Sequence, residues 1–246
     1  MKLIPAIDLR GGKCVRLYQG DYDQQTDYSD NPIAVARDFE QLGCPDLHIV
    51  DLDGARSGEQ DNHMMVTAIC AATGFDVQLG GGIRDAEVIE RWLEAGVRRC
   101  VVGSMAVNEP ETVQQWMADF GRDRIVLALD VRIDDAGTPM LATHGWTEDS
   151  GVSLWQCVDA YLDHGLRHVL CTDIGRDGAM SGPNVELYET FIERYPGVLL
   201  QASGGVRDIN DLVTLRAAGA HGAISGRALL DGRITAEEVE SFLRDA

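Results

Sequence analysis

Short apolar runs alternate with longer amphipathic stretches along the whole chain of 246 residues. The apolar runs are nearly continuous, as in Ile4–Asp8 and Val126–Asp130, which is typical of parallel strands buried on both faces. The pattern predicts eight strands, over residues 2–8, 46–51, 75–79, 99–103, 124–130, 167–172, 198–202 and 221–225.

Helical patterns fill most of the intervals between these strands. The stretch 32–39 begins with Pro32 directly after Asn31, which suits the first turn and the cap of a helix. Two further helices are predicted to begin at Asp85 and Asp208. The alternation does not break at a linker, and a chain of about 250 residues is the usual size of a (β/α)8 barrel. We therefore predict an α/β fold with one barrel domain over residues 1–246.

Two segments depart from the simple alternation, and each directly follows a predicted strand. Residues 13–18 predict a short extra strand, followed by a polar loop through residue 30. Residues 132–151 predict a long polar loop that contains Trp146 and also His144, whose role the sequence does not decide. Segments that follow a barrel strand lie on the catalytic face, and loops of this length usually serve function.

The chain repeats its own motifs at an offset of 122 or 123 residues. The matching segments are 4–8 with 126–130, 80–85 with 203–208, and 102–106 with 225–229. The repeat predicts two half-barrels, at about 1–121 and 122–246, related by two-fold symmetry.

Glycine-rich turns at matched places in the two halves predict two phosphate sites. A tight turn without side chains lets backbone N–H groups approach phosphate oxygens. Such sites are frequently built after strands 7 and 8 of a barrel, and the repeat adds a second site after strands 3 and 4. The candidates are Gly81, Gly82, Gly103, Ser104, Gly204, Gly205, Gly226 and Arg227. Ser104 can add a hydroxyl donor, whereas Arg227 either binds phosphate or faces solvent.

Three aspartates are the candidates for proton transfer. Asp8 and Asp130 end the first and fifth strands, which lie opposite each other in an eight-stranded barrel. The two carboxylates would then face one another midway between the phosphate sites. Asp177, in a glycine-rich stretch after strand 6, can swing over a bound ligand. The arrangement favours general acid/base chemistry on a molecule with two phosphates.

The other polar residues near the strands are given structural roles. Asp51 and Asp173 are predicted to cap or brace, and His48 to pack in the core rather than to catalyse. The chain contains no H-E-x-x-H, P-loop or dinucleotide-binding motif. We therefore expect neither a metal nor a cofactor.

Composition limits the classes of partner. With 21 Lys+Arg against 40 Asp+Glu, the net charge of −19 argues against nucleic acid. It does not oppose an anionic ligand, because affinity depends on local donors.

The six scattered cysteines indicate reduced thiols, and no apolar run approaches the roughly 18 residues of a membrane span. No signal-peptide pattern precedes the first strand. We expect a cytoplasmic monomer that binds a small molecule, not a membrane.

The motifs together resemble the phosphoribosylformimino-5-aminoimidazole carboxamide ribotide (ProFAR) isomerase family of histidine biosynthesis, over essentially the whole chain. The matching stretches are 4–9, 15–22, 48–55, 78–84, 127–132, 145–146, 172–178 and 203–206. The resemblance implies a (β/α)8 barrel that converts an aminoaldose into an aminoketose, an Amadori rearrangement that needs no cofactor. The family's substrate carries a phosphate at each end, which fits the doubled glycine turns.

The resemblance also implies roles for single residues. Asp8 aligns with the general base of the family and Asp130 with the residue usually given as proton donor. Asp177, together with Thr172, aligns with positions also proposed to assist or to supply the acid. The residues that align near the substrate are Arg16, Arg84 and Trp146.

Three alternative functions would fit parts of the same pattern. The cyclase subunit of imidazole glycerol phosphate synthase shares the half-barrel repeat, but it carries Cys where this chain has Ala6 and Lys where it has Arg16. A dual-substrate isomerase that also acts on phosphoribosylanthranilate stays open. A catalytically silent, phosphate-binding barrel predicts that one half has lost its acid, and both halves retain one.

Overall fold

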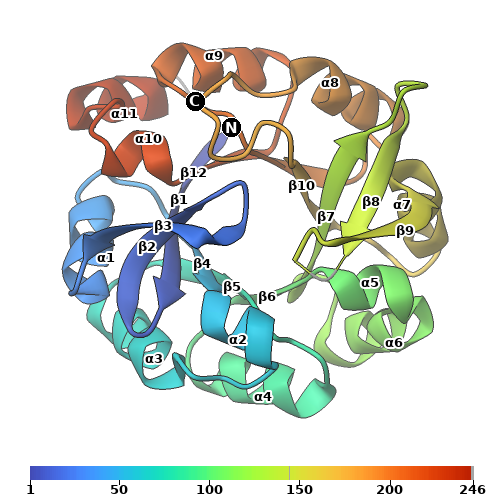
Figure 1. Cartoon of the computed structure of the whole chain (residues 1–246), viewed down its shortest axis with the longest axis horizontal. Coiled ribbons are helices and arrows are strands. Elements are labelled where there is room, and N and C mark those ends of the chain that lie inside the picture. The colour runs from blue at the N-terminus through green and yellow to red at the C-terminus, as the bar shows by residue number, and fades with distance from the viewer. Residues whose placement is uncertain (144, 245–246) are drawn as a thin grey trace.

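Eight parallel strands form a closed barrel in the computed structural model, which describes residues 1–143 and 145–244 (Figure 1). In spatial order the strands are β1 (Lys2–Arg10), β4 (Asp46–Asp51), β5 (Asp76–Gly80), β6 (Arg99–Val102), β7 (Ile125–Ile133), β10 (His168–Asp173), β11 (Leu199–Ser203) and β12 (Gly222–Ser225). The ring closes where β12 pairs with β1 and where β7 pairs with β10. All eight predicted strands are confirmed to within one residue, except that β1 and β7 extend further at their carboxyl ends.

Helices surround the barrel (Figure 1). They are α1 (Pro32–Glu40), α2 (Leu52–Ser57), α3 (His63–Ala72), α4 (Ala86–Glu94), α5 (Ser104–Asn108), α6 (Pro110–Phe120), α7 (Leu154–Leu162), α8 (Val185–Arg194), α9 (Ile209–Ala217), α10 (Arg227–Leu230) and α11 (Ala236–Arg244). The side chains of Asn31, Asp85 and Asp208 accept hydrogen bonds from backbone N–H groups at the starts of α1, α4 and α9. These caps satisfy donors that the helix itself leaves unpaired, so the predicted helix starts are confirmed. Within the described residues, none of the helices is both long enough and apolar enough to cross a membrane.

Apolar side chains form separate layers outside and inside the ring of strands. The outer layer packs strands against helices and contains the fully buried Trp92, Tyr188 and Phe191. Complete burial of a phenylalanine stabilises a fold by roughly 1.5–3 kcal/mol. A small inner layer fills the barrel itself with Ile4, Ala6, Val101, Val126, Leu170 and Ile224. The inner layer therefore closes the barrel interior beneath the carboxyl ends of the strands and holds those ends in place.

Antiparallel extensions are attached to β1 and to β7, where the sequence predicted mainly loops. The predicted extra strand β2 (Lys13–Tyr18) pairs with β1, and β3 (Asp21–Ser29) pairs with β2. On the opposite side, β8 (Pro139–Thr143) pairs with β7, and β9 (Glu148–Ser153) pairs with β8. His144 lies outside the described residues.

The predictions of a polar loop through residue 30 and of a loop over 132–151 are thus wrong, because both segments contain strands. β3 and β9 are polar and largely exposed. Backbone pairing rather than a buried apolar face holds such strands, so the hydrophobic pattern does not reveal them.

Candidate active site

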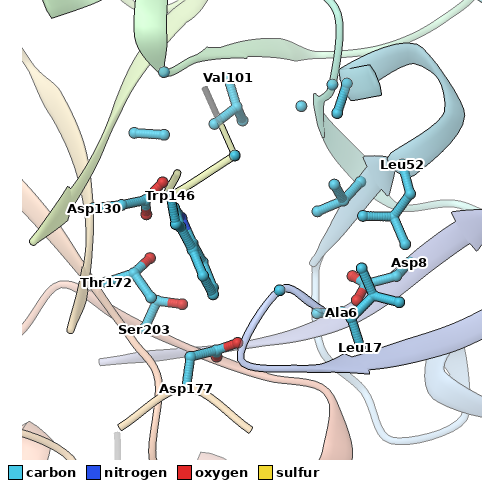
Figure 2. A pocket seen from close by; sticks show the side chains of 18 of the residues that line it. Ala6, Asp8, Leu17, Leu52, Val101, Asp130, Trp146, Thr172, Asp177 and Ser203 are labelled. Carbon is cyan, nitrogen blue, oxygen red and sulfur yellow. The ribbon is translucent and has the colours of Figure 1, made fainter. Parts of the chain in front are cut away.

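A cavity of about 1160 Å³ opens at the carboxyl ends of the barrel strands, and every barrel strand contributes to its lining (Figure 2). This is the end of the barrel at which the βα loops meet. The lining contains all fifteen residues that the sequence analysis selected: Asp8, Arg16, Gly81, Gly82, Arg84, Gly103, Ser104, Asp130, Trp146, Thr172, Asp177, Gly204, Gly205, Gly226 and Arg227. The structure brings them together, whereas their individual roles stay predictions.

Asp8 forms an ion pair with Arg16 on one wall of the cavity. Because β2 folds back along β1, Arg16 Nη1 lies 2.9 Å from Asp8 Oδ2. The same guanidinium reaches Asp177, with 4.0 Å between Nη2 and Oδ2. Burial raises the pKa of Asp8 above its ordinary value, and the charge of Arg16 opposes this shift. The ion pair therefore favours the ionised form of Asp8.

Asp130 lies on β7, on the opposite wall, next to Trp146 and Thr172 (Figure 2). Burial raises its pKa, hydrogen bonds from the Trp146 and Thr172 side chains oppose the shift, and the charge of Asp177 adds to it. Among the described residues, no cation pairs with Asp130. The charge of Asp177 raises the pKa of Asp8 as well, so the two carboxyl groups differ in the guanidinium beside Asp8 and the neutral donors beside Asp130. A carboxyl group with neutral donors holds a proton more easily than one beside a guanidinium.

Asp51 and Asp173 brace equivalent loops in the two halves. Asp51 accepts hydrogen bonds from the Gly54 backbone N–H (2.9 Å) and from Asn62 Nδ2 (2.6 Å). Asp173 accepts one from Asn184 Nδ2 (2.7 Å), and the two asparagines are themselves 122 positions apart. These contacts agree with the structural role predicted for both aspartates.

In two of the glycine turns a glycine is required by packing, whatever the turns bind. Gly81 has φ +111°, and a Cβ there would overlap the carbonyl oxygen of Asp51. Gly205 has φ +84°, and a Cβ there would overlap the carbonyl oxygen of Gly182. Glycine is the residue that tolerates both the left-handed backbone and the close approach. Binding of phosphate by these turns stays a prediction.

Arginines at equivalent positions of the two halves have different partners. Arg207 donates to the Asp211 carboxylate from Nε (2.9 Å) and from Nη2 (2.7 Å). Val88 stands where the repeat places the counterpart of Asp211, and no carboxylate of the described chain forms an ion pair with Arg84. Arg84 is exposed at the cavity wall, so its guanidinium is available to an anion.

The cavity lining is balanced in charge although the chain as a whole is acidic, because it holds five arginines and five aspartates (Asp8, Asp21, Asp23, Asp130 and Asp177). The arginines in the lining are Arg10, Arg16, Arg56, Arg84 and Arg227. For Arg227 the sequence left two interpretations open. It lines the cavity, yet it already donates to the Gly178 carbonyl (2.7 Å) and pairs with Asp231 (3.2 Å).

A buried polar cluster inside the barrel was not predicted from the sequence. Gln78 and Gln201 exchange two hydrogen bonds, of 2.7 and 3.0 Å, and Gln78 also contacts His48 Nδ1 at 3.1 Å. Burial and the charge of Arg16 lower the pKa of His48 to about 3, so this imidazole is neutral. The sequence did contain a signal that could have revealed this cluster: two glutamines stand 123 positions apart, each in an apolar strand.

The chain matches a model of a known protein family over most of its length. A model of the family described as "Histidine biosynthesis protein" matches residues 2–235. The matched range contains all eight barrel strands and both antiparallel extensions, so the likeness extends well beyond the glycine turns.

Proposed function

Because the chain belongs to the histidine biosynthesis protein family, we propose that it is an isomerase of that pathway and acts on ProFAR. The reaction is an Amadori rearrangement that converts the bis-phosphorylated aminoaldose into an aminoketose. One observation carries the proposal: Asp8 and Asp130 face one cavity from opposite strands, one paired with a guanidinium and the other with neutral donors. An aldose–ketose isomerisation needs a general base and a general acid, and where two carboxyl groups take these roles, one must be ionised and the other protonated at the same pH.

Proton donation opens the sugar ring in the first step. A protonated carboxyl group, on Asp130 or on Asp177, donates to the ribose ring oxygen. The bond between that oxygen and C1′ breaks, and the nitrogen lone pair forms the C=N bond of a protonated Schiff base. Asp130 is the donor that its surroundings favour, because burial raises its pKa and no cation among the described residues pairs with it, whereas Arg16 lies 4.0 Å from Asp177.

Proton removal from C2′ is the second step. Ionised Asp8 takes this proton, and the electron pair moves into the C1′–C2′ bond to give an enolamine. C1′ is then protonated and the C2′ hydroxyl group loses its proton, which yields the ketose. Asp8 gives up the proton that it took and the acid regains the one that it donated, so both groups are restored for the next turnover. The net reaction moves hydrogen within the substrate, so no external oxidant or reductant is consumed.

The two phosphates of the substrate would be held at the two sets of glycine turns. One set comprises Gly81, Gly82, Gly103 and Ser104, and the other comprises Gly204, Gly205, Gly226 and Arg227. Arg84 gives the first set a guanidinium without a carboxylate partner, a feature that its counterpart Arg207 lacks. This difference between the halves would favour one orientation of a substrate whose two ends are chemically different.

A side-by-side assay on ProFAR and on phosphoribosylanthranilate tests the proposal. Turnover of ProFAR alone is the expected result. Turnover of both compounds would identify a dual-substrate isomerase. If neither compound reacts while both still bind, the chain is a silent phosphate-binding barrel, and the proposed activity is wrong.

Replacing Arg16 by glutamine should move the acidic limb of the kcat/KM profile to higher pH. Asp8 must be ionised to act as a base, and the charge of Arg16 opposes the burial that raises its pKa. Without that charge the pKa of Asp8 rises further, so activity is lost at a higher pH as the solution is acidified.

Arg10→Gln is the matched control for this pH profile. Arg10 also lines the cavity, but it donates to Gln25 and to the Tyr22 carbonyl rather than to a carboxylate. A limb that stays in place in Arg16→Gln, or that moves equally in the control, would show that the ion pair does not set the titration of the base.

A further inference from the structure

The turn between β2 and β3 contacts the turn between β8 and β9 across the cavity. Gly20 in the first turn has φ +75°, and a Cβ built on it would lie 2.7 Å from Cε3 and 3.0 Å from Cζ3 of Trp146. The backbone at Gly20 therefore packs directly against the six-membered ring of the indole. The two turns belong to extensions of β1 and β7, which lie opposite each other in the barrel.

The backbone of Trp146 is also held in place. Its φ of +72° is a rare conformation for a bulky residue, one that persists only where the surroundings enforce it. The Arg132 guanidinium donates to the Trp146 carbonyl oxygen, and its Nη1 lies 3.1 Å from Asp149 Oδ1. Arg132 thus ties the β8–β9 turn to the end of β7.

The indole is consequently held from two sides while it points toward Asp130 (Figure 2). Arg132 holds the backbone of Trp146, and Gly20 contacts the ring edge. The indole N–H group also donates a hydrogen bond to the Asp130 carboxylate. A shift of the ring edge at Gly20 would therefore change the position of the indole N–H relative to Asp130.

We infer that Gly20 is a positioning residue, which seats the Trp146 indole against Asp130. Even a methyl group at this position would overlap the ring by several tenths of an ångström, and the ring would have to move. The contact between Gly20 and the indole is given by interatomic distances and does not depend on the proposed function. Its kinetic consequence rests on the proposed function, in which Asp130 touches the reacting sugar.

Gly20→Ala compared with Gly12→Ala is the test. Gly12, in the turn between β1 and β2, has the same φ of +75° but no atom within 4 Å of an added Cβ. Both variants place alanine at the same φ, and only Gly20→Ala inserts a methyl group into the indole. The readout is the ¹H–¹⁵N signal of the indole N–H group, with four tryptophans in the chain and Trp146 assigned from Trp146→Phe.

The Trp146 signal should move in Gly20→Ala and stay in place in Gly12→Ala. On ProFAR, kcat/KM should fall roughly 10–100-fold in Gly20→Ala, the effect of a small misplacement at a reacting group, and little in Gly12→Ala. An unmoved signal in Gly20→Ala, or an equal movement in Gly12→Ala, would overturn the inference. If the signal moves as expected but the wild-type protein turns over neither substrate, the proposed function fails and the positioning role stands.

If Gly20→Ala folds poorly, the double variant Gly20→Ala/Trp146→Ala still tests the inference. In a Trp146→Ala background the ring is gone, so only the backbone strain remains. There Gly20→Ala should lower the midpoint of thermal unfolding no more than Gly12→Ala does in the same background. A clearly larger loss would mean that the cost at Gly20 does not come from the indole, which would also overturn the inference.

Discussion

Replacing Asp8 by asparagine should lower kcat on ProFAR by about 10²–10⁴-fold while the substrate still binds. The amide keeps the size of the carboxylate and can accept a hydrogen bond from Arg16, which lies 2.9 Å away in the wild type. It cannot take the proton from C2′. Calorimetric titration of the variant with ProFAR would measure binding separately from turnover.

Asp23→Asn is the matched control, since it removes the same charge from the lining of the same cavity. It should retain near-normal turnover. A substrate deuterated at C2′ sharpens the test. If proton removal limits the Asp8→Asn variant, its residual rate should show a full primary isotope effect. Near-normal turnover of Asp8→Asn would instead show that another group is the base.

Replacing Asp130 by asparagine should lower kcat by a similar factor of about 10²–10⁴ for a different reason. Asp130 has no cation partner within the described chain, and burial raises its pKa, so it suits a proton donor. In Asp130→Asn, ring opening rather than C2′–H cleavage should limit the rate. The isotope effect of the C2′-deuterated substrate should then fall toward one, the opposite of the result for Asp8→Asn.

Asp177→Asn separates the two candidate acids. Asp177 lies on the loop after β10, 4.0 Å from Arg16 and close enough to influence both other aspartates. We expect a smaller loss than in Asp130→Asn and an isotope effect that persists. If Asp177→Asn instead loses more of its kcat than Asp130→Asn does, and also loses the isotope effect, proton donation would be assigned to Asp177.

Many residues of the candidate site were predictable from the sequence, because short local patterns identify them. Asp8 and Asp130 were recognisable at the ends of apolar runs, and the glycine turns recur at a constant offset. The difference between Arg84 and Arg207 was not predicted, although its cause can be read from the sequence. That difference depends on whether a carboxylate lies four positions further on, as Asp211 does and Val88 does not.

The amino-acid sequence by itself determined the eight barrel strands, the order in which they follow one another, and the carboxylates at their ends. A strand buried on both faces needs an unbroken apolar run, and that run is written in the chain. Only the tertiary structure decided the partners of those carboxylates. Arg16 reaches Asp8 because β2 folds back on β1, and Trp146 reaches Asp130 because β8 and β9 return over β7 and meet Gly20. The apolar positions of β2 predicted a strand, but not its pairing with β1. The polar strands β3 and β9 are held by backbone hydrogen bonds, which every residue except proline can supply, so the side-chain pattern does not reveal them.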